Sequence, residues 1–387
     1  MSKESRAAKS GYLVEAVLRA CDLLEAFRGE GELVRLRELV ARTGMNKTTA
    51  FRLLTTLEQR GLVERVGEHQ YRSAIKPLNR KKYRLGYAAL DSEISFSRDI
   101  TEGLTRASEE ERIDLLTLDN EFNSKLAVRN ADIFIREKVD LVFEHQGDEQ
   151  ISAVVSSKFI EAGIPMIAIH VPHPGATYFG PDNYNAGLIG GRYLGRWAKQ
   201  HWGGKVDHVI LLELPRSGLF ARSRLTGTLV GIKEVLRDLG NSVLFMNGQG
   251  LYGPSLDMVR MHIRRRGAGR TLISGINDPS TIGAIRAFEE AGSGANCAAL
   301  GHGASIEARA ELRRPKTPLV ASVGYFPERY GEPLIHLALQ ILTKQPVPPA
   351  TFTKPKMIDP TNVDHFYPTD PLRTQSEMTT LLLSGTV

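Results

Sequence analysis

Apolar residues in the first fifth of the chain recur at helical spacing and predict a small helical module. One amphipathic helix is predicted from five apolar positions that fall on a single face. These positions are Leu13, Val17, Ala20, Leu24 and Phe27. A second helix is predicted to begin with Leu33, Leu36, Leu39 and Val40.

A turn at Thr43-Gly44-Met45-Asn46 separates this second helix from a third, predicted from Lys47 to Gln59. Gly44 suits a helix C-cap and Asn46 suits an N-cap. One face of the third helix is apolar, with Ala50, Leu53, Leu54 and Leu57. The opposite face carries Lys47, Thr48, Phe51, Arg52 and Thr55.

Two short strands, LVERV and HQYRS, are predicted to follow this helix around a turn at Gly67-Glu68. Helix, turn, helix and hairpin in this order are typical of a winged helix-turn-helix, whose second motif helix reads the major groove of DNA. In the hairpin, Arg65, His69 and Arg72 are expected to contact phosphates. Phe51 is compatible with a thymine methyl contact and equally with packing inside the domain or a dimer.

The distribution of charge agrees with a DNA-binding module at this end of the chain. Residues 1–82 hold 17 Lys and Arg against 10 Asp and Glu, a net charge of +7, whereas the remainder holds 33 against 34, a net of −1. A basic module joined to a nearly neutral body suggests a domain for a polyanion and a body with another task.

Residues 11–75 resemble the N-terminal domain of IclR-type transcriptional regulators, through VEAVLRACDLLEAF, LVARTGMNKTTAFRLLTTLEQRGLVER and YRSA. The resemblance implies a dimer or tetramer and DNA contacts for Asn46, Lys47, Thr48, Thr49 and Arg52. The usual effector domain of that family does not follow. We therefore expect a DNA-binding domain over 1–75 and a basic linker over 76–82, which is either a tether or a further DNA contact.

From residue 83 onward, short apolar strands alternate with amphipathic helices. This rhythm predicts βαβ units, parallel sheets covered on both faces and, for about 300 residues, two α/β lobes. The predicted strands begin with 83–89 and continue through 113–118, 139–144, 165–170, 206–213, 243–246, 271–275, 298–301 and 319–323. The predicted helices include 97–108, 151–162, 184–201 and 224–239.

Several function classes lack their sequence signatures. No Walker loop, G-x-G-x-x-G after a strand, G-x-S-x-G or H-E-x-x-H occurs, so neither a catalytic residue nor a cofactor is expected. The glycines of GLIGGRYLG fall inside a helical pattern and are interpreted as packing glycines. Two distant cysteines, Cys21 and Cys297, support neither a disulfide framework nor a metal site. Without a secretory signal or an apolar run of ~18 residues, a cytoplasmic protein is expected.

Polar and aromatic residues gather directly after the predicted strands of the body. Carboxylates and a guanidinium bind neighbouring hydroxyls, and rings cover the apolar face of a sugar, so this set favours a polyhydroxylated ligand in the cleft between lobes. Each residue alone is also compatible with a helix cap or a loop contact. The set comprises Phe96, Asp119, Glu144, His145, His170, Arg224, Asn277, Asp278, His302 and Tyr325.

Residues 83–368 are similar to type I periplasmic binding proteins and to the effector domain of LacI-type regulators, in particular the branch with ribose-binding protein. The similarity rests on LGYAALDSEISFSRDITEGL, VDLVFEHQGDEQ, EAGIPMIAIHVPHPGATYFGPDNYNAG, NDPSTIGAIRAFEEAG and ASVGYFPERYGEPLIHLALQIL. It implies two Rossmann-like lobes joined by three crossovers. The first lobe would hold about 83–182 and 326–354, and the second about 183–325 and 355–387.

The resemblance assigns roles to four residues of this chain: Phe96 as a stacking aromatic, Arg224, Asp278 of the Asn-Asp motif, and Tyr325 at the last hinge. Two departures stand out, because His170-Val171 replaces the usual Asp-Arg pair and the first-strand Asn is replaced near Glu93–Ile94. The sugar is therefore not identified by the resemblance.

Together these patterns lead us to expect a ligand-responsive transcriptional regulator that is not an enzyme. Its partners would be operator DNA, a small effector that is a sugar or sugar derivative, and a second copy of the chain in a homodimer or dimer of dimers. A sugar phosphate, a nucleobase or another polar metabolite remains an alternative effector, and His170 and His302 keep it open. A sugar-acting enzyme is a further alternative.

Overall fold

The computed structural model describes residues 14–27, 31–74, 83–236, 239 and 243–370. The chain divides into two units, Met1–Lys82 and Tyr83–Val387. Leu13, the predicted linker 76–82 and the predicted lobe residues beyond 370 lie outside the described residues. The two units are described separately below.

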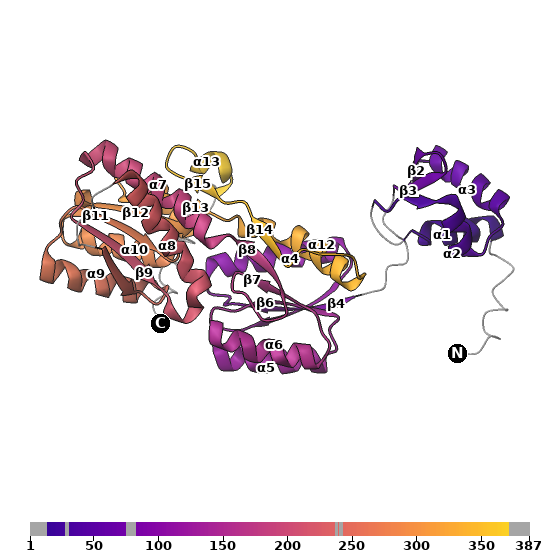
Figure 1. Ribbon diagram of the computed structural model, residues 1–387, viewed down its shortest axis with the longest axis horizontal. Coiled ribbons are helices and arrows are strands. Elements are labelled where there is room, and N and C mark those ends of the chain that lie inside the picture. Colours follow the sequence, from indigo (N-terminus) through magenta and orange to yellow (C-terminus); the bar gives the residue numbers. More distant parts are fainter. Residues whose placement is uncertain (1–13, 28–30, 75–82, 237–238, 240–242, 371–387) are drawn as a thin grey trace. The chain divides into compact units, whose positions relative to one another are not determined.

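The first unit combines three helices with a small antiparallel sheet of order β1-β3-β2 (Figure 1). Its core contains the fully buried Leu23, Leu39, Leu54 and Tyr71. The elements are α1 (Glu15–Glu25), β1 (Val34–Arg35), α2 (Leu36–Thr43), α3 (Lys47–Gln59), β2 (Val63–Gly67) and β3 (Gln70–Ser73).

Both predicted caps around the turn are confirmed. Gly44 ends α2 in the left-handed region with φ 69°, and Asn46 Oδ1 accepts a hydrogen bond of 2.8 Å from the Thr49 amide. Two predictions in this unit are wrong. The second helix begins at Leu36, because Val34 and Arg35 pair with β3 as a strand. The hairpin turn lies at Glu68-His69, where His69 adopts φ 61°.

The first lobe of the second unit is a six-stranded, fully parallel sheet of order β14-β8-β7-β6-β4-β5. Helices α5 and α6 cover one face, and α4 and α12 cover the other (Figure 1). The elements are β4 (Arg84–Ala89), α4 (Ser95–Glu110), β5 (Asp114–Asp119), α5 (Ser124–Arg136), β6 (Leu141–His145), α6 (Glu149–Glu161), β7 (Met166–Ile169), β8 (Thr177–Pro181), α12 (Gly331–Leu342) and β14 (Ala350–Thr353).

The second lobe is a six-stranded sheet of order β10-β9-β11-β12-β13-β15, in which only β15 is antiparallel. Its helical elements are α7 (Asn183–Trp202), η3 (Pro215–Ser217), α8 (Gly218–Val235), α9 (Tyr252–Arg266), α10 (Asp278–Glu290), η4 (Gly294–Asn296), α11 (Ile306–Arg313) and α13 (Val363–Phe366), whereas η5 (Pro327–Arg329) packs on α4 of the first lobe. Its strands are β9 (His208–Glu213), β10 (Val243–Asn247), β11 (Thr271–Gly275), β12 (Cys297–Gly303), β13 (Leu319–Gly324) and β15 (Lys356–Ile358).

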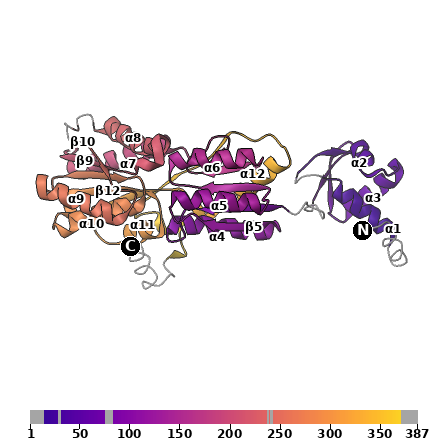
Figure 2. The ribbon, with the colours of Figure 1, turned by 90° about the horizontal axis from the view of Figure 1, so that it is seen from below.

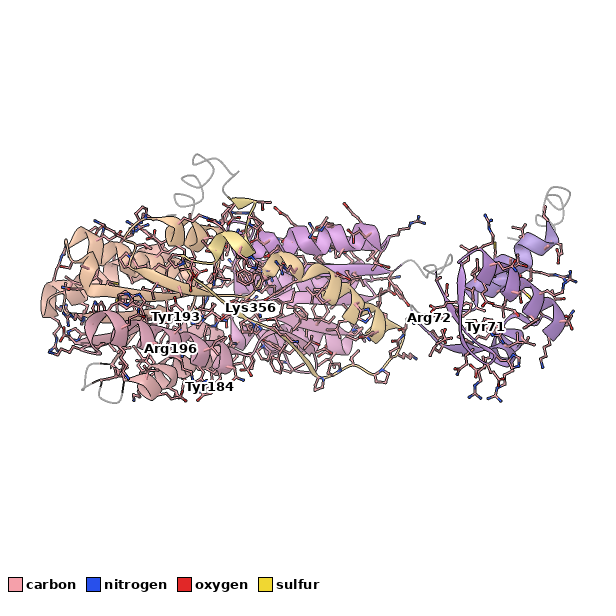
Figure 3. The ribbon with its side chains drawn as sticks, turned by 90° about the horizontal axis from the view of Figure 1, so that it is seen from above. Tyr71, Arg72, Tyr184, Tyr193, Arg196 and Lys356 are labelled. Atoms are coloured by element: carbon pink, nitrogen blue, oxygen red, sulfur yellow. The ribbon has the colours of Figure 1, made fainter. Side chains whose placement is uncertain are left out.

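The two lobes lie side by side in both ribbon views, and the chain passes between them after β8, after β13 and after β14 (Figures 1 and 2). In the second lobe, α7 and α8 pack on one face of the sheet, and α9, α10 and α11 pack on the other. The hydroxyl of Tyr193 on α7, which Figure 3 labels, donates a 3.0 Å hydrogen bond to Asp359, just after β15.

Glycines bring α7 and α8 into backbone contact, as the interpretation of GLIGGRYLG predicted. A Cβ on Gly187 would lie 1.9 Å from the Arg224 carbonyl oxygen, and one on Gly191 would lie 2.0 Å from that of Thr228. From the other helix, a Cβ on Gly227 would meet the Tyr184 carbonyl at 2.2 Å. This close packing fixes the backbone that carries Arg224.

The predicted α/β architecture is confirmed, whereas one helix boundary is wrong. The helix predicted over 224–239 is α8, which begins six residues earlier, at Gly218, and ends at Val235. A 3-10 turn opened by Pro215 precedes it, and Leu236 has an extended backbone. Strands β8, β14 and β15 and helices α9, α10, α11, α12 and α13 were not predicted individually. No helix of the described segments has the length and apolar character that crossing a bilayer requires.

Candidate functional site

The predicted DNA-binding side chains lie on the surface of the first unit. Seven of the eight are exposed and Thr49 is half-buried. The exposed ones are Asn46, Lys47, Thr48, Phe51, Arg52, Arg65 and His69. Phe51 is 39% exposed, so its ring does not tuck fully into the core of this unit.

Helix α3 presents its cations to solvent, because its apolar side is fixed in the core by Ala50, Leu54 and Leu57. Among the residues that the structure describes, neither Lys47 nor Arg52 forms an ion pair. Arg72 differs, since its Nε donates a 3.1 Å hydrogen bond to Glu64 across the hairpin. Figure 3 labels Arg72 beside Tyr71, the buried neighbour on β3.

The eight predicted ligand-binding residues all line one cavity of the second unit, with a volume of about 160 Å³. A water occupies about 30 Å³ in the liquid, so the cavity has room for roughly five waters or for a small ligand that replaces them. Those residues are Phe96, His145, His170, Arg224, Asn277, Asp278, His302 and Tyr325.

The first lobe contributes a cluster of rings to the cavity wall. Phe96 comes from the first turn of α4, His145 from the end of β6, and His170 from just after β7. The Phe96 and His170 rings meet edge to face, with centroids 5.2 Å apart. His170 Nε2 lies 3.1 Å from the Tyr330 hydroxyl, which fixes the ring orientation.

Arg224 of α8 is 8% exposed and is held by neutral oxygens of the second lobe. Its Nε and Nη2 donate to Asn183 Oδ1 at 3.0 and 2.6 Å, and its Nη1 donates to the Ile276 carbonyl. The guanidinium carbon lies 5.1 Å from the centre of the Tyr325 ring. These contacts orient the guanidinium at the cavity wall.

Asp278 is buried at the start of α10, and both of its oxygens already accept hydrogen bonds. Ser322 Oγ donates to Oδ1 at 2.6 Å, and the Ser305 amide donates to Oδ2 at 2.7 Å. Burial raises the pKa of this carboxyl to about 6, while the two hydrogen bonds act to lower the pKa. The group is therefore mostly ionised at pH 7 and accepts hydroxyl donors.

The cavity histidines are neutral at pH 7. Burial, assisted by His173, lowers the pKa of His145 to about 3. Burial also holds the pKa of His170 and of His302 well below the usual value, and the Arg224 charge adds to both shifts. His302 Nδ1 lies 3.0 Å from the Tyr325 hydroxyl. A neutral imidazole offers one donor and one acceptor, which suits hydroxyl groups.

Of the predicted strand-end cluster, two residues do not line the cavity, and a third lines it but uses its side chain to cap a helix. Asp119 and Glu144 do not line the cavity. Strand residues alternate between faces, so Glu144 follows the opposite face from His145, and its Oε1 accepts a 3.0 Å hydrogen bond from Asn120. Asn277 lines the cavity but caps α10 through the Ser280 amide and donates to the Gly250 carbonyl at 2.8 Å.

Residues that the sequence did not single out join the two lobes beside the cavity. Ser95 donates to Glu307 at 2.8 Å, and Ser217 donates to the Gly147 carbonyl at 2.7 Å. The Arg216 guanidinium lies 3.4 Å from the centre of the Phe122 ring. These residues lie in loops or at helix starts, where the sequence shows no periodic pattern. The sequence therefore gave no clear signal for contacts between the lobes.

Comparisons with solved structures show the fold of the second unit in other proteins. A periplasmic solute-binding protein of an ABC transporter from Actinobacillus succinogenes 130z, with bound D-allose, is 20% identical and has a TM-score of 0.64 over 73% of this chain and 100% of that chain. A protein from Mycobacterium smegmatis in complex with β-D-fucofuranose is 19% identical, with a TM-score of 0.63 over 78% and 98%. A galactofuranose binding protein is 18% identical and has a TM-score of 0.66 over 75% of this chain and 99% of that chain.

Family models match both units of the chain. The IclR helix-turn-helix domain matches residues 16–67, and the periplasmic binding protein domain matches residues 85–346. The search of curated proteins found no match. Both resemblances seen in the sequence are thereby confirmed. The chain belongs to the periplasmic binding protein domain family and carries an IclR helix-turn-helix domain in front of that domain.

Proposed function

We propose that this protein is a transcriptional regulator whose operator affinity is controlled by a small sugar or sugar derivative in the cavity of the second unit. The observation that carries the proposal is that one chain joins an exposed cationic recognition helix to a cavity of about 160 Å³ lined by Arg224, Asp278 and neutral imidazoles. The solved structures with bound sugars support the ligand class.

The proposed mechanism is allosteric. A ligand that contacts Phe96 and His170 of one lobe and Arg224 and Asp278 of the other stabilises the arrangement in which the lobes touch. The interlobe hydrogen bonds of Ser95 and Ser217 belong to that arrangement. Coupling of ~1–3 kcal/mol between the two sites gives a 5–150-fold change in operator affinity.

A dimer is part of the proposal, because two DNA-binding units on one operator must change their spacing. An apolar face of α1 supports self-association. The side chains of Val17 and Leu18 are 58% and 40% exposed, and that of Val14, just before the helix, is 63% exposed. Cys21, one turn further along, is half-exposed.

The test uses the full chain and DNA from the promoter regions that flank its own gene. Fluorescence anisotropy gives operator affinity, and a thermal-shift screen over a sugar library gives the ligand. We expect a sugar that raises the melting temperature and changes operator affinity at least fivefold. A ligand that is chemically altered during incubation would instead favour a sugar-acting enzyme, and a chain that binds no promoter DNA would contradict the regulator.

Arg52→Ala separates the two sites. Loss of one phosphate or base contact costs ~1–3 kcal/mol and weakens operator binding about 5- to 150-fold. Ligand affinity measured by calorimetry should stay unchanged, because Arg52 belongs to the first unit. Arg60→Ala, an exposed residue just beyond α3, is the matched control.

A further inference from the structure

Charge in the cavity is concentrated on two side chains. Of the described residues that line the cavity, Arg224 and Asp278 are the ones with ionisable groups that are charged near pH 7. The two differ in how their charge is balanced. Asp278 receives two donors from Ser322 and Ser305, which compensate an ionised carboxylate.

Arg224 has no such compensation by opposite charge. The acceptors of its hydrogen bonds are an amide oxygen and a backbone carbonyl, and no Asp or Glu of the described ranges lies within ion-pair distance of it. A buried cation without an anionic partner is costly, and the cost is relieved when a carboxylate binds. Three of its five N–H groups point to these neutral oxygens, and the Tyr325 hydroxyl also interacts with the guanidinium.

The remainder of the wall suits a neutral, hydroxylated body. His145 Nδ1 and His302 Nε2 are buried without a hydrogen-bond partner in the described structure, and both residues line the cavity at 3% and 2% exposure. Phe96 supplies an apolar ring surface beside them. The imidazoles carry no charge, so they add hydrogen bonds without adding a second cationic site.

We propose that the effector is an acidic sugar, a polyol with one carboxylate, in which the carboxylate binds Arg224 and the hydroxyls bind Asp278, His145 and His302. This inference rests on the proposed sugar-sensing function and narrows its ligand class. A carboxylate matches a single guanidinium in charge. A phosphate dianion would bring a second negative charge into a cavity that already contains the Asp278 carboxylate and in which Arg224 is the single cation among the described lining residues.

The experiment measures binding to the full chain by calorimetry for ligands with the same carbon framework. The first series is D-glucose, D-glucuronate, D-gluconate and D-glucose 6-phosphate, and the second is the corresponding galactose series. We expect one acid to bind at least tenfold more tightly than its neutral parent and than its phosphate. We also expect the same acid to change operator affinity.

Arg224→Gln tests the assignment to this side chain. It should weaken the acid at least 100-fold and the neutral parent less than fivefold, with Arg222→Gln as the control on the same helix, since Arg222 is exposed and pairs with Glu213. Because Arg224→Gln can also disturb α8, its melting temperature is measured as well. The comparison of the acid with its neutral parent sugar in the wild-type chain does not depend on this variant.

The outcomes separate this inference from the proposed function. A neutral sugar that binds more tightly than its acid and releases the operator would overturn the acidic ligand and leave the regulator in place. The tightest binding by a phosphate would do the same. If no member of either series binds, the acidic sugar is rejected, and if the wider sugar library also fails to shift operator affinity, the sugar-sensing function is rejected as well.

Discussion

The two lobes contribute different chemistry to the same cavity. The first lobe supplies neutral rings, Phe96, His145 and His170, whereas the second supplies both charged groups, Arg224 and Asp278. In the first lobe, rings contact rings at centroid distances of 5.2–5.6 Å. In the second, each charged group is fixed by at least two hydrogen bonds.

This difference suggests a division of tasks. A charged group gives strong, directional binding only when it is preorganised, and the second lobe provides that support through Asn183, Ser305 and Ser322. Rings give smaller and less directional energies, which suits a surface that closes over a ligand already held. We infer that the second lobe sets ligand affinity and that the first lobe reports occupancy by closing.

The largest effect is expected where the support of the second lobe is most tightly packed. Gly191→Ala places a Cβ 2.0 Å from a backbone oxygen of α8, which must move. We expect a loss of at least about 3 kcal/mol in the free energy of unfolding, beyond the range of ordinary overpacking. Gly253→Ala in α9 is the control, because its Cβ meets nothing within 4 Å, and it should be neutral or stabilising. Equal urea midpoints for the two variants would contradict the packing account.

Asp278→Asn should have the next largest effect, on ligand affinity. Hydrogen bonds to charged groups contribute ~1.5–3 kcal/mol, so the variant should bind about 10- to 150-fold more weakly by calorimetry. The amide keeps the shape and can still accept from the Ser305 amide. Unchanged affinity would show that the carboxylate does not take part in binding.

Ligand affinity should depend on pH through the same carboxyl. Its pKa of about 6 in the folded chain lies above the usual 3.8, so the ionised form that accepts hydroxyls is lost as the pH falls through 6. Between pH 7 and pH 5 the ionised fraction, and with it the affinity, should fall about tenfold. The same shift makes folding bind a proton between pH 3.8 and 6, so this group disfavours the folded state as the pH rises through that window.

The neighbours of Asp278 allow the fall in ligand affinity between pH 7 and pH 5 to be assigned to this carboxyl. Burial and, to a smaller extent, Glu307 of α11 raise the pKa of Asp278, while His302 stays neutral over this range. Burial raises the pKa of Glu144 to about 8, so that group stays protonated between pH 5 and 7. The step should disappear in Asp278→Asn, and a step that persists there would have to come from another group.

The smallest effect is expected in the first lobe. Phe96→Leu removes ring stacking worth ~0.5–1.5 kcal/mol and should weaken the ligand about two- to tenfold. If the comparison of the lobes is right, this variant loses more of the operator response than Asp278→Asn does at equal occupancy of the cavity. A loss of affinity larger than that of Asp278→Asn would reverse the assigned tasks.

Much of this site could be predicted from the sequence, because parallel strands bring their carboxyl ends to one edge. Residues as distant as Phe96 and Tyr325 therefore line one cavity. The prediction for Glu144 was wrong because a shift of one position along a strand reverses the face. The Ser95–Glu307 and Arg216–Phe122 contacts depend on how loops of two lobes meet, which no local pattern encodes.

Boundaries were predicted well where a capping residue marks them and poorly elsewhere. Helix α3 was predicted to its last residue, since Asn46 begins it and Gly61 follows it closely. The start of α8 was missed because Gly218 opens it with φ 78° after a proline-led turn, and its first residues have no clear periodicity. The edge strands β14 and β15, of four and three residues, are too short to show an alternation.

The most direct test of the account is the operator affinity of the full chain, measured by anisotropy with and without the tightest ligand of the sugar screen, for wild type and Arg224→Gln. We predict a change of at least fivefold for wild type, and for Arg224→Gln the same affinity without ligand and no change with it. If ligand leaves wild-type affinity unchanged, or if Arg224→Gln still responds at ligand concentrations at which calorimetry detects no binding to it, then occupancy of this cavity does not control DNA binding.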